Sequence, residues 1–408
     1  MNCRHCHAEL KEPFLDLGSA PHSNAYLTAQ TLHDPELWFP LKVLVCTRCW
    51  LVQTEDVVDA GALFTADYAY FSSYSETWLK HAEDYVQVMV ERFNLGGESL
   101  VVELAANDGY LLQYVKRRGI PCLGIEPTAN TALAARAKGV EIIQAFFTQE
   151  LGSSLAVSGR QADLIVANNV LAHVPEINDF LLGVAELLKP EGVATFEFPH
   201  LLELIRNAQF DTVYHEHFSY LSMTALLGIF DQNGLAPFDL EQLTTHGGSL
   251  RVYVQKKGRG SRQASARLSA CLELEARAGM RDGAFYAAFQ PKADEIKNAF
   301  LSFLLEVQSS GKTVAGYGAA AKGNTLLNYA GVRPDLLPFV VDRNPAKQGR
   351  FLPGSRIPIL PEAALTELRP DFIVILPWNL REEVVAQLAY AREWGGQFVT
   401  AVPTLRIG

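Results

Sequence analysis

Two pairs of cysteines near the start of the chain have the spacing of metal ligands. The four thiols belong to Cys3, Cys6, Cys46 and Cys49. Two Cys-x-x-Cys pairs offer four thiolates to one Zn²⁺ ion, which completes a tetrahedral site with no position open for a substrate. His5 and His7 are alternative ligands at the first pair. The spacing therefore predicts a structural zinc site, with four unligated thiols as the alternative.

A polar turn of small residues follows an apolar stretch at 100–104. The run Ala105-Ala-Asn107-Asp-Gly109 lets the backbone approach a nucleotide-type ligand closely. Glu126 comes about twenty residues later, where a carboxylate can accept hydrogen bonds from ribose hydroxyls. The turn lacks the G-x-G pattern of dinucleotide sites, and an ordinary strand-end carboxylate is the alternative for Glu126. We expect a nucleoside-containing cofactor here.

Four polar side chains stand in a row at Tyr214, His215, Glu216 and His217. A histidine beside a glutamate can act as a general base near neutral pH. The row follows the fifth expected strand, so it should lie over the carboxyl edge of a parallel sheet, where α/β proteins bind ligands. If the segment is extended, Tyr214 and Glu216 point one way and the two histidines the other. We expect acid–base chemistry without a catalytic metal because the H-E-x-x-H pattern is absent, with a polar surface loop as the alternative.

A glycine-containing turn follows an apolar stretch at 313–317. Gly316-Tyr-Gly318-Ala-Ala-Ala321 opens a helix, Lys322 stands beside it, and Asp342 ends the next apolar stretch. Such a turn can cradle phosphate, and Lys322 adds positive charge. The turn predicts binding of NAD or of the pyrophosphate of a nucleotide-sugar, with tight helix packing alone as the alternative.

Two further residues are candidates for the same site. His173 follows the fourth expected strand, at the carboxyl edge of the sheet, although a lone histidine is often only structural. Tyr68 belongs to an aromatic cluster that precedes the first strand of the central sheet, where it can cover an active site as a lid. A place in the core is the alternative for aromatic residues of this kind.

The elements that position these residues alternate between strands and helices. Apolar stretches at 100–104, 121–126, 140–144, 162–167 and 192–198 predict five parallel strands, and 237–242 with 249–255 predict a closing pair. We expect helices at 130–138 and 177–188, the second ended by Pro190-Glu-Gly192, and a third that begins after the cap Ser222. Residues 264–309 have helical spacing, and a second series of strands lies at 313–317, 337–341, 371–376 and 397–402.

The composition limits the classes of function. The 408 residues carry a formal net charge of -10, and no basic patch stands out, which argues against a nucleic-acid partner. Apolar runs reach only the length of buried strands, and the N-terminal residues form no apolar signal region. We expect a cytoplasmic protein with no membrane partner.

Six motifs together resemble one family, the sugar C-methyltransferases. They are the doubled Cys-x-x-Cys, Glu103 to Leu112, Asn168 to Pro175, Tyr214 to His217, His246 to Arg251, and Gly316 to Asn324. They cover nearly the whole chain in this order, and no motif is missing. The family more often has Ser where this chain has Ala106, a change that leaves the turn small. The type examples methylate C3 of thymidine-diphosphate-linked 4-keto-6-deoxysugars.

The resemblance implies an α/β chain of three modules and a connecting region. These are a zinc-binding module at 1–65, a central class I Rossmann-like methyltransferase domain at 66–257, a helical linker at 258–310 and a C-terminal Rossmann-like domain at 311–408. S-adenosylmethionine and structural Zn²⁺ are the implied cofactors, and a dTDP- or GDP-linked keto-sugar is the implied substrate.

The resemblance also implies roles for individual residues. The cofactor-binding residues would be Glu103, Ala105, Asn107, Gly109, Glu126, Phe146, Phe147 and Asn168. The nucleotide-sugar would be bound by His246, Ser249, Gly318, Lys322 and Asn324. The catalytic residues would be Tyr68, His173, Tyr214, Glu216 and His217.

A mechanism follows from the chemistry of such a substrate. A ketone at C4 acidifies the hydrogen on C3, and His217 is our choice for the base that removes it. Tyr68, Tyr214 or His173 can donate hydrogen bonds to the enolate oxygen, and Glu216 can orient a neighbouring histidine. The alternatives are methylation at another position or on oxygen, an NAD-dependent sugar oxidoreductase, and a zinc-ribbon scaffold without turnover.

Overall fold

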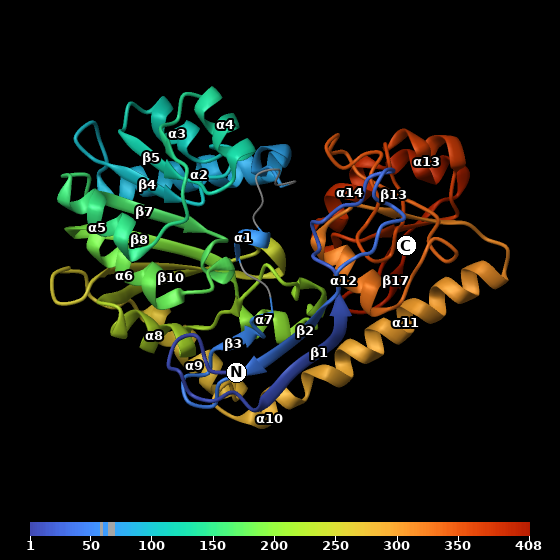
Figure 1. The fold of residues 1–408 in the computed structure, drawn as a ribbon, viewed down its shortest axis with the longest axis horizontal. Coiled ribbons are helices and arrows are strands. Elements are labelled where there is room, and N and C mark those ends of the chain that lie inside the picture. Colours follow the sequence, from blue (N-terminus) through green and yellow to red (C-terminus); the bar gives the residue numbers. More distant parts are fainter. Residues whose placement is uncertain (58–59, 64–69) are drawn as a thin grey trace.

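The chain folds into two lobes joined by a small N-terminal sheet and a long helix (Figure 1). This computed structural model describes residues 1–57, 60–63 and 70–408. In that part of the chain, no helix combines the length and the apolar character that a membrane span requires.

The N-terminal sheet is antiparallel and has four strands in the order β1-β2-β3-β9. Its strands are β1 (Glu12–Ala20), β2 (Phe39–Val45), β3 (Val52–Thr54) and β9 (Ser219–Tyr220). Alternating burial along β1 and β2 gives this sheet one apolar face. The fourth strand comes from far along the chain and begins two residues after His217, so this sheet holds one end of the polar row at 214–217.

The central lobe is a seven-stranded sheet in the order β10-β11-β8-β7-β4-β5-β6. Its strands are β4 (Val101–Leu104), β5 (Cys122–Ile125), β6 (Ile142–Ile143), β7 (Ala162–Asn168), β8 (Leu188–Pro199), β10 (Leu235–Leu243) and β11 (Ser249–Lys256). The first five run parallel, and β11 returns antiparallel to β8 and β10. This confirms the expected alternation of strands and helices and the closing pair.

Helices cover both faces of the central sheet. One face packs against α2 (Glu76–Phe93), α3 (Leu112–Arg117) and α4 (Ala129–Ala137). The other packs against α5 (Gln149–Val157), α6 (Ile177–Leu187), α8 (Met223–Gln232) and α9 (Ala266–Ala278). The Ser222 hydroxyl accepts a hydrogen bond from the Ala225 N–H and caps α8, as predicted.

The helix expected at 177–188 ends at Leu187, as predicted. The fifth strand begins earlier than its expected start at 192, because β8 already begins at Leu188. Leu188 pairs with Ala162 of β7, with an irregular register just after that pair. The next pair joins Leu164 to Val193, so the proline and glycine lie in an irregular stretch between two paired parts of β8.

The C-terminal lobe repeats the strand–helix plan with a six-stranded sheet in the order β14-β13-β12-β15-β16-β17. Its strands are β12 (Val314–Tyr317), β13 (Val340–Val341), β14 (Ile359–Leu360), β15 (Phe372–Ile375), β16 (Gln397–Thr400) and β17 (Arg406–Ile407). One face packs against α11 (Phe289–Ser309) and α12 (Ala321–Tyr329), and the other against α13 (Ala363–Leu368) and α14 (Arg381–Gln387). The remaining helices are α1 (Ala60–Leu63), α7 (Leu201–Arg206) and α10 (Gly283–Ala287).

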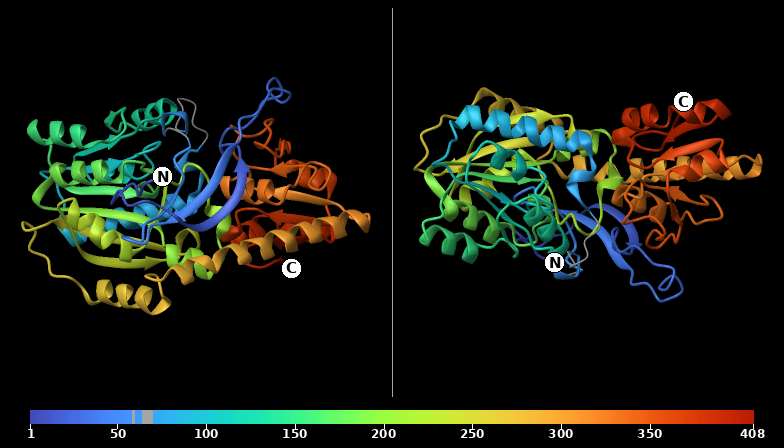
Figure 2. Two further views of the ribbon diagram at one scale, coloured as in Figure 1. Left: turned by 60° about the horizontal axis from the view of Figure 1, so that its bottom comes forward. Right: turned by 90° about the horizontal axis from the view of Figure 1, so that it is seen from above.

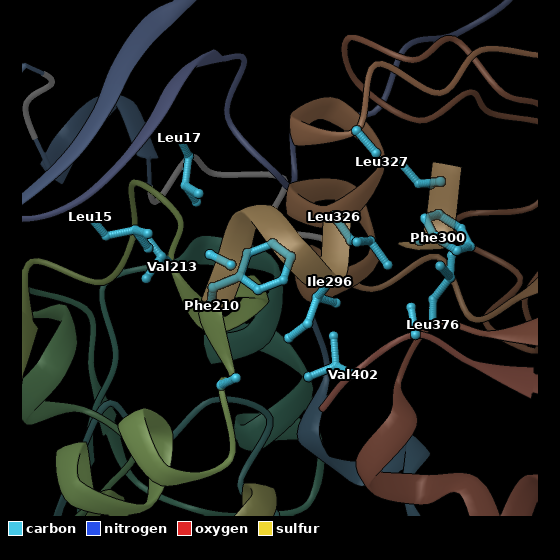
Figure 3. Close-up of a cluster of buried hydrophobic side chains, with 14 of the residues drawn as sticks. Leu15, Leu17, Phe210, Val213, Ile296, Phe300, Leu326, Leu327, Leu376 and Val402 are labelled. Atoms are coloured by element: carbon cyan, nitrogen blue, oxygen red, sulfur yellow. The ribbon is translucent and has the colours of Figure 1, made fainter. Parts of the chain in front are cut away.

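A single apolar core joins the N-terminal sheet to the C-terminal lobe. Leu15 and Leu17 of β1, Phe210 and Val213 just before the polar row, and Ile296 of α11 belong to it (Figure 3). Its other labelled members are Phe300, Leu326, Leu327, Leu376 and Val402. Burial of this much apolar surface fixes the lobes relative to each other. In Figures 1 and 2, α11 runs from beneath the central lobe to the C-terminal lobe.

Candidate active site

The four predicted zinc ligands converge on one point. Their sulfur atoms lie within 4.8 Å of one another, with Cys3 Sγ 3.6 Å from Cys49 Sγ and Cys6 Sγ 3.5 Å from Cys46 Sγ. Tetrahedral zinc with bonds of about 2.3 Å separates its sulfur ligands by about 3.8 Å, so the four thiols fit this ion. Neither alternative ligand joins the group, because His5 Nδ1 lies 2.8 Å from Asn178 Oδ1 and His7 is exposed.

A glutamine side chain connects the thiol cluster to the N-terminal sheet. Gln53 Nε2 donates to Cys3 Sγ at 3.3 Å, and its Oε1 accepts from the Arg4 N–H at 2.9 Å. The hydrogen bond with Cys49 lowers the pKa of the Cys3 thiol against the opposing effect of burial, and Gln53 contributes to the lowering, which favours the thiolate form that binds a metal.

The turn between β4 and α3 has the backbone of a cofactor-binding loop. Ala105, Asn107 and Gly109 all have positive φ angles, of 53°, 49° and 74°. Gly109 also packs tightly, because a Cβ atom there would lie 3.2 Å from the Cβ of Ala135. Glu126 follows β5, and its carboxylate accepts hydrogen bonds from the N–H groups of Asn107 at 2.8 Å and Thr128 at 2.9 Å.

Two buried polar side chains lie at this sheet edge. Glu103 and Asn168 are 1% and 7% exposed; the Asn168 amide has no hydrogen-bond partner in the described part of the chain, and the Glu103 carboxylate interacts with the side chain of Tyr110. Burial raises the pKa of Glu103 well above its ordinary value. Buried polar groups normally have partners, and the amino, carboxylate and ribose groups of S-adenosylmethionine offer donors and acceptors of the kind that the Asn168 amide lacks.

The two phenylalanines expected near the adenine differ. Phe147 is partly buried and packs edge-on against Phe180 at a ring distance of 5.4 Å. Phe146 is 47% exposed. Phe146 is therefore the better candidate for a stacking contact.

The polar row at 214–217 forms a turn rather than an extended strand. The His217 N–H donates to the Tyr214 carbonyl at 2.9 Å, and the Tyr214 hydroxyl lies 2.8 Å from His217 Nε2. The opposite orientations expected of an extended segment do not apply, because a turn brings residues three apart together. His215 faces away from them, toward the Pro40 carbonyl at 3.1 Å.

The surroundings of His217 determine which ring nitrogen carries a proton. Nδ1 lies 2.8 Å from the Thr212 carbonyl, which can only accept, so Nδ1 donates and Nε2 is the free acceptor. Burial and nearby His173 lower the pKa of His217 well below its ordinary value. Burial raises the pKa of Tyr214, so its hydroxyl stays protonated and donates to Nε2. The geometry provides a neutral imidazole with an unprotonated nitrogen.

His173 joins this pair as expected. Its ring packs edge-on against that of His217 with centroids 4.6 Å apart, and burial lowers its pKa to about 4. Glu216 is 3% exposed and accepts a hydrogen bond from Asn24 at 2.6 Å. Tyr68, the fifth catalytic candidate, lies outside the described residues.

The C-terminal turn faces the same region from the opposite lobe. Gly318 has a φ of 89°, and a Cβ there would lie 2.6 Å from Pro377 Cδ, so the turn needs glycine. The Lys322 ammonium lies 4.9 Å from the Trp378 ring centroid and donates to Asn379 at 3.2 Å. Asn324 is 1% exposed, and its amide has no side-chain partner in the described residues.

Two other predicted substrate residues have different surroundings. The His246 ring packs against Trp78 at 5.3 Å, and its Nε2 lies 3.2 Å from Asn169 Nδ2. Burial lowers the pKa of His246 to about 4, and the charge of Lys322 contributes to this lowering. Ser249 is buried and donates to the Thr245 carbonyl at 2.9 Å, so its hydroxyl serves the local fold.

Sequence reasoning missed two polar groups at the lobe interface. Asp211 is fully buried and accepts a hydrogen bond from Trp378 Nε1 at 2.7 Å. Burial, partly offset by Lys322, raises the pKa of Asp211 to about 6. In the sequence, only the position of Asp211 just before the polar row indicates a role for it. No local pattern distinguishes Trp378.

An ion-pair network that sequence reasoning also missed lies near the edge of the central sheet. Buried Arg251 donates to Glu197 at 2.8 Å, and His81 lies 2.9 Å from the same carboxylate. No local pattern in the sequence indicates this network. It depends on strand pairing, which places Glu197 of β8 opposite Arg251 of β11.

Three family models match successive parts of the chain. Residues 3–64 match "Putative zinc binding domain", residues 78–239 match "Methyltransferase domain", and residues 244–403 match "C-methyltransferase C-terminal domain".

Individual known proteins are also similar. The C-methyltransferase NovU of Streptomyces niveus is 35% identical over 406 residues, which cover 99% of this chain and 96% of that protein. A ubiquinone biosynthesis O-methyltransferase of Azorhizobium caulinodans is 24% identical over 114 residues, covering 26% of this chain and 45% of that protein. The structure of magnesium protoporphyrin IX methyltransferase from Synechocystis PCC 6803 with bound SAM matches with a TM-score of 0.34 and 16% identity, over 44% of this chain and 79% of that chain.

Proposed function

We propose a substrate for this chain, which belongs to the family of S-adenosylmethionine-dependent C-methyltransferases. We infer that it methylates a sugar carbon, C3, beside the ketone of a nucleotide-linked 4-keto-6-deoxysugar. The observation that carries this proposal is the neutral His217 imidazole, held with its unprotonated Nε2 against the Tyr214 hydroxyl. A carbon beside a ketone needs such a base before it can accept a methyl group.

In this proposal, different residues bind the cofactor and remove the proton. Ala105, Asn107, Gly109 and Glu126 would hold S-adenosylmethionine, whose sulfonium supplies an electrophilic methyl group for attack by the sugar carbon. His217 Nε2 removes the proton from C3. The low pKa of His217 keeps this nitrogen unprotonated at neutral pH.

The negative charge that develops on the sugar oxygen needs hydrogen-bond donors. Tyr214 is placed to supply one, since its hydroxyl remains protonated. His173 and Tyr68 are the other candidates. Buried Glu216 orients the groups around the base.

The C-terminal turn would bind the nucleotide part of the substrate. Gly318 allows the backbone to approach a pyrophosphate closely, and Lys322 supplies positive charge at the start of α12. The buried amide of Asn324 offers both a donor and an acceptor. Thymidine and guanosine diphosphates carry the same pyrophosphate, so this chemistry serves either nucleotide.

The test is incubation of the purified protein with S-adenosylmethionine and dTDP- or GDP-linked 4-keto-6-deoxysugars. We expect one methylated product by mass spectrometry, with NMR placing the new carbon–carbon bond at C3. Methylation at another carbon would overturn the assignment of C3. The absence of product with both nucleotides would overturn the proposed substrate class. Native mass spectrometry with S-adenosylhomocysteine and NAD in competition should show retention of the first.

A further inference from the structure

The connection between β1 and β2, residues 21–38, carries the zinc-binding module to the far lobe (Figure 2). Leu27 pairs with Phe351 of the C-terminal lobe. Glu36 Oε1 accepts a hydrogen bond from the Gly354 N–H at 2.6 Å, and its Oε2 lies 3.4 Å from Arg356 Nε. The connection is therefore docked on the C-terminal lobe at several points.

One side chain of this connection reaches the polar row at 214–217. Asn24 Nδ2 lies 2.6 Å from Glu216 Oε1. An ionised carboxylate can only accept hydrogen bonds, so the amide nitrogen of Asn24 must face it. This contact joins residues 192 positions apart and directly engages the turn that holds Tyr214 and His217.

The burial of Glu216 makes its hydrogen bond with Asn24 important for the orientation of the carboxylate. Glu216 is 3% exposed, and a buried carboxylate is costly unless hydrogen bonds compensate for the lost water. A donor at a fixed place therefore selects the orientation of the carboxylate. Glu216 lies within the two-residue turn between Tyr214 and His217, so its orientation bears on both.

The same short stretch also touches the C-terminal turn. The Tyr26 hydroxyl donates to the Ala319 carbonyl at 2.7 Å, and Lys347 Nζ donates to that carbonyl at 2.8 Å. Asn24 thus contacts the polar row at 214–217, and Tyr26 contacts the turn beside Gly318. This places Asn24 at the junction of the three modules.

We propose that Asn24 is a positioning residue for the reaction, which holds the Glu216 carboxylate in its working orientation. The proposal rests on the proposed function, in which Glu216 orients groups around His217. It assigns the zinc-binding module a part in catalysis through its β1–β2 connection, apart from the metal cluster.

The test compares Asn24→Ala and Glu216→Gln with the unaltered enzyme. We expect Asn24→Ala to lower kcat, and the exchange of the sugar C3 hydrogen with solvent, by about 10- to 100-fold, because small misplacements of reacting groups cost that much. The affinity for S-adenosylhomocysteine should stay within about twofold. Glu36→Gln is the matched control in the same connection, and its kcat should stay within about twofold.

A swapped pair separates positioning from simple structural support. In the double variant Asn24→Asp with Glu216→Gln, the hydrogen bond returns with its polarity reversed. We expect its melting temperature to recover to that of the unaltered enzyme while kcat stays low, because the carboxylate no longer stands at position 216.

Each result bears on one of the two proposals. Asn24→Ala with kcat within about twofold of the unaltered enzyme, beside a Glu216→Gln variant that loses activity, would overturn the role of Asn24 alone. Recovery of kcat in the swapped pair would also overturn it, because the contact would then be structural. Full activity of Glu216→Gln would remove the role of Glu216 itself, and the inference with it.

Discussion

The hydrogen bond between His217 Nδ1 and the Thr212 carbonyl determines the chemistry available to this side chain. It fixes one tautomer and leaves Nε2 as the acceptor that meets the Tyr214 hydroxyl. The neighbouring His215 is also buried, but its Nε2 faces the Pro40 carbonyl of the N-terminal module. Two histidines separated by one residue therefore have different hydrogen-bond partners.

His217→Asn should abolish proton removal from the sugar. We expect exchange of the C3 hydrogen with deuterium oxide to fall by about 10²- to 10⁴-fold, the usual contribution of a general base. The exchange is followed by mass spectrometry with S-adenosylhomocysteine in place of the methyl donor. His215→Asn is the matched control and should exchange at nearly the rate of the unaltered enzyme. Unchanged exchange in His217→Asn would exclude this residue as the base.

Histidines with lowered pKa values should make the fold sensitive to mild acid. Burial lowers the pKa values of His22, His173 and His246 from 6.5 to about 4. The unfolded chain therefore binds more protons below pH 6.5, and stability should fall as the pH decreases from 6.5 to 4. Asp211, with a pKa raised to about 6, opposes part of this loss.

This loss can be measured by urea unfolding between pH 7.5 and pH 4.5. His22→Phe should reduce the dependence of the free energy of unfolding on pH, because it removes one of these titrating groups. This residue suits the test, since His22 stacks on Phe39 and lies outside the proposed catalytic set. An unchanged pH dependence in that variant would show that His22 does not contribute.

At the scale of elements, the two lobes use the same connection between strand and helix. After β4, the Asn107 N–H donates to Glu126, and after β12, the Ala319 N–H donates to Asp342, both at 2.8 Å. In each case a carboxylate at the end of the next strand holds the turn in place. The positive φ angles of Asn107 and Gly318 belong to these two turns.

Gly318→Ala should damage the C-terminal turn. The added Cβ would meet Pro377 at 2.6 Å in a backbone conformation that disfavours alanine. We expect a loss of about 1–3 kcal/mol in the free energy of unfolding, and a higher KM for the nucleotide-sugar with unchanged binding of S-adenosylhomocysteine. Calorimetry and steady-state kinetics measure the two effects.

Gly331→Ala is the matched control for this variant. Gly331 has a φ of 68°, also positive, but a Cβ there meets nothing within 4 Å. It should lower stability through backbone strain alone and leave the KM unchanged. Equal effects of the two variants on the KM would contradict a specific role for the turn at Gly318.

At the scale of the whole molecule, one sheet contacts both the thiol cluster and the polar row at 214–217. Gln53 of β3 contacts Cys3 and pairs with Ser219 of β9, and the Thr54 hydroxyl donates to the His217 carbonyl at 3.2 Å. The N-terminal sheet therefore supports the backbone of the proposed base.

Removal of zinc should impair catalysis more than cofactor binding. We expect Cys46→Ser, or treatment with a chelator, to lower the melting temperature and kcat, while S-adenosylhomocysteine still binds at the turn after β4. Metal analysis, thermal unfolding and calorimetric titration distinguish these effects. Cys122→Ser lies outside the cluster and should keep both zinc and activity. Full kcat in a zinc-free protein would contradict this support.

The sequence by itself determined the features that depend on neighbouring residues. Spacing of apolar residues marked the two series of strands and helices, and Ser222 marked the start of α8. The Cys-x-x-Cys spacing identified four thiols that the structure brings within 4.8 Å. These features follow from local geometry, which repeats with fixed periods along the chain.

Only the tertiary structure decided how the site is assembled. The turn that joins Tyr214 to His217, the docking of His5 on Asn178, and the Trp378–Asp211 contact follow from packing between modules. The contacts from Asn24 to Glu216 and from Trp378 to Asp211 span 192 and 167 residues. No local period encodes such distances, because they arise when three apolar surfaces pack into one core and bring distant polar groups together.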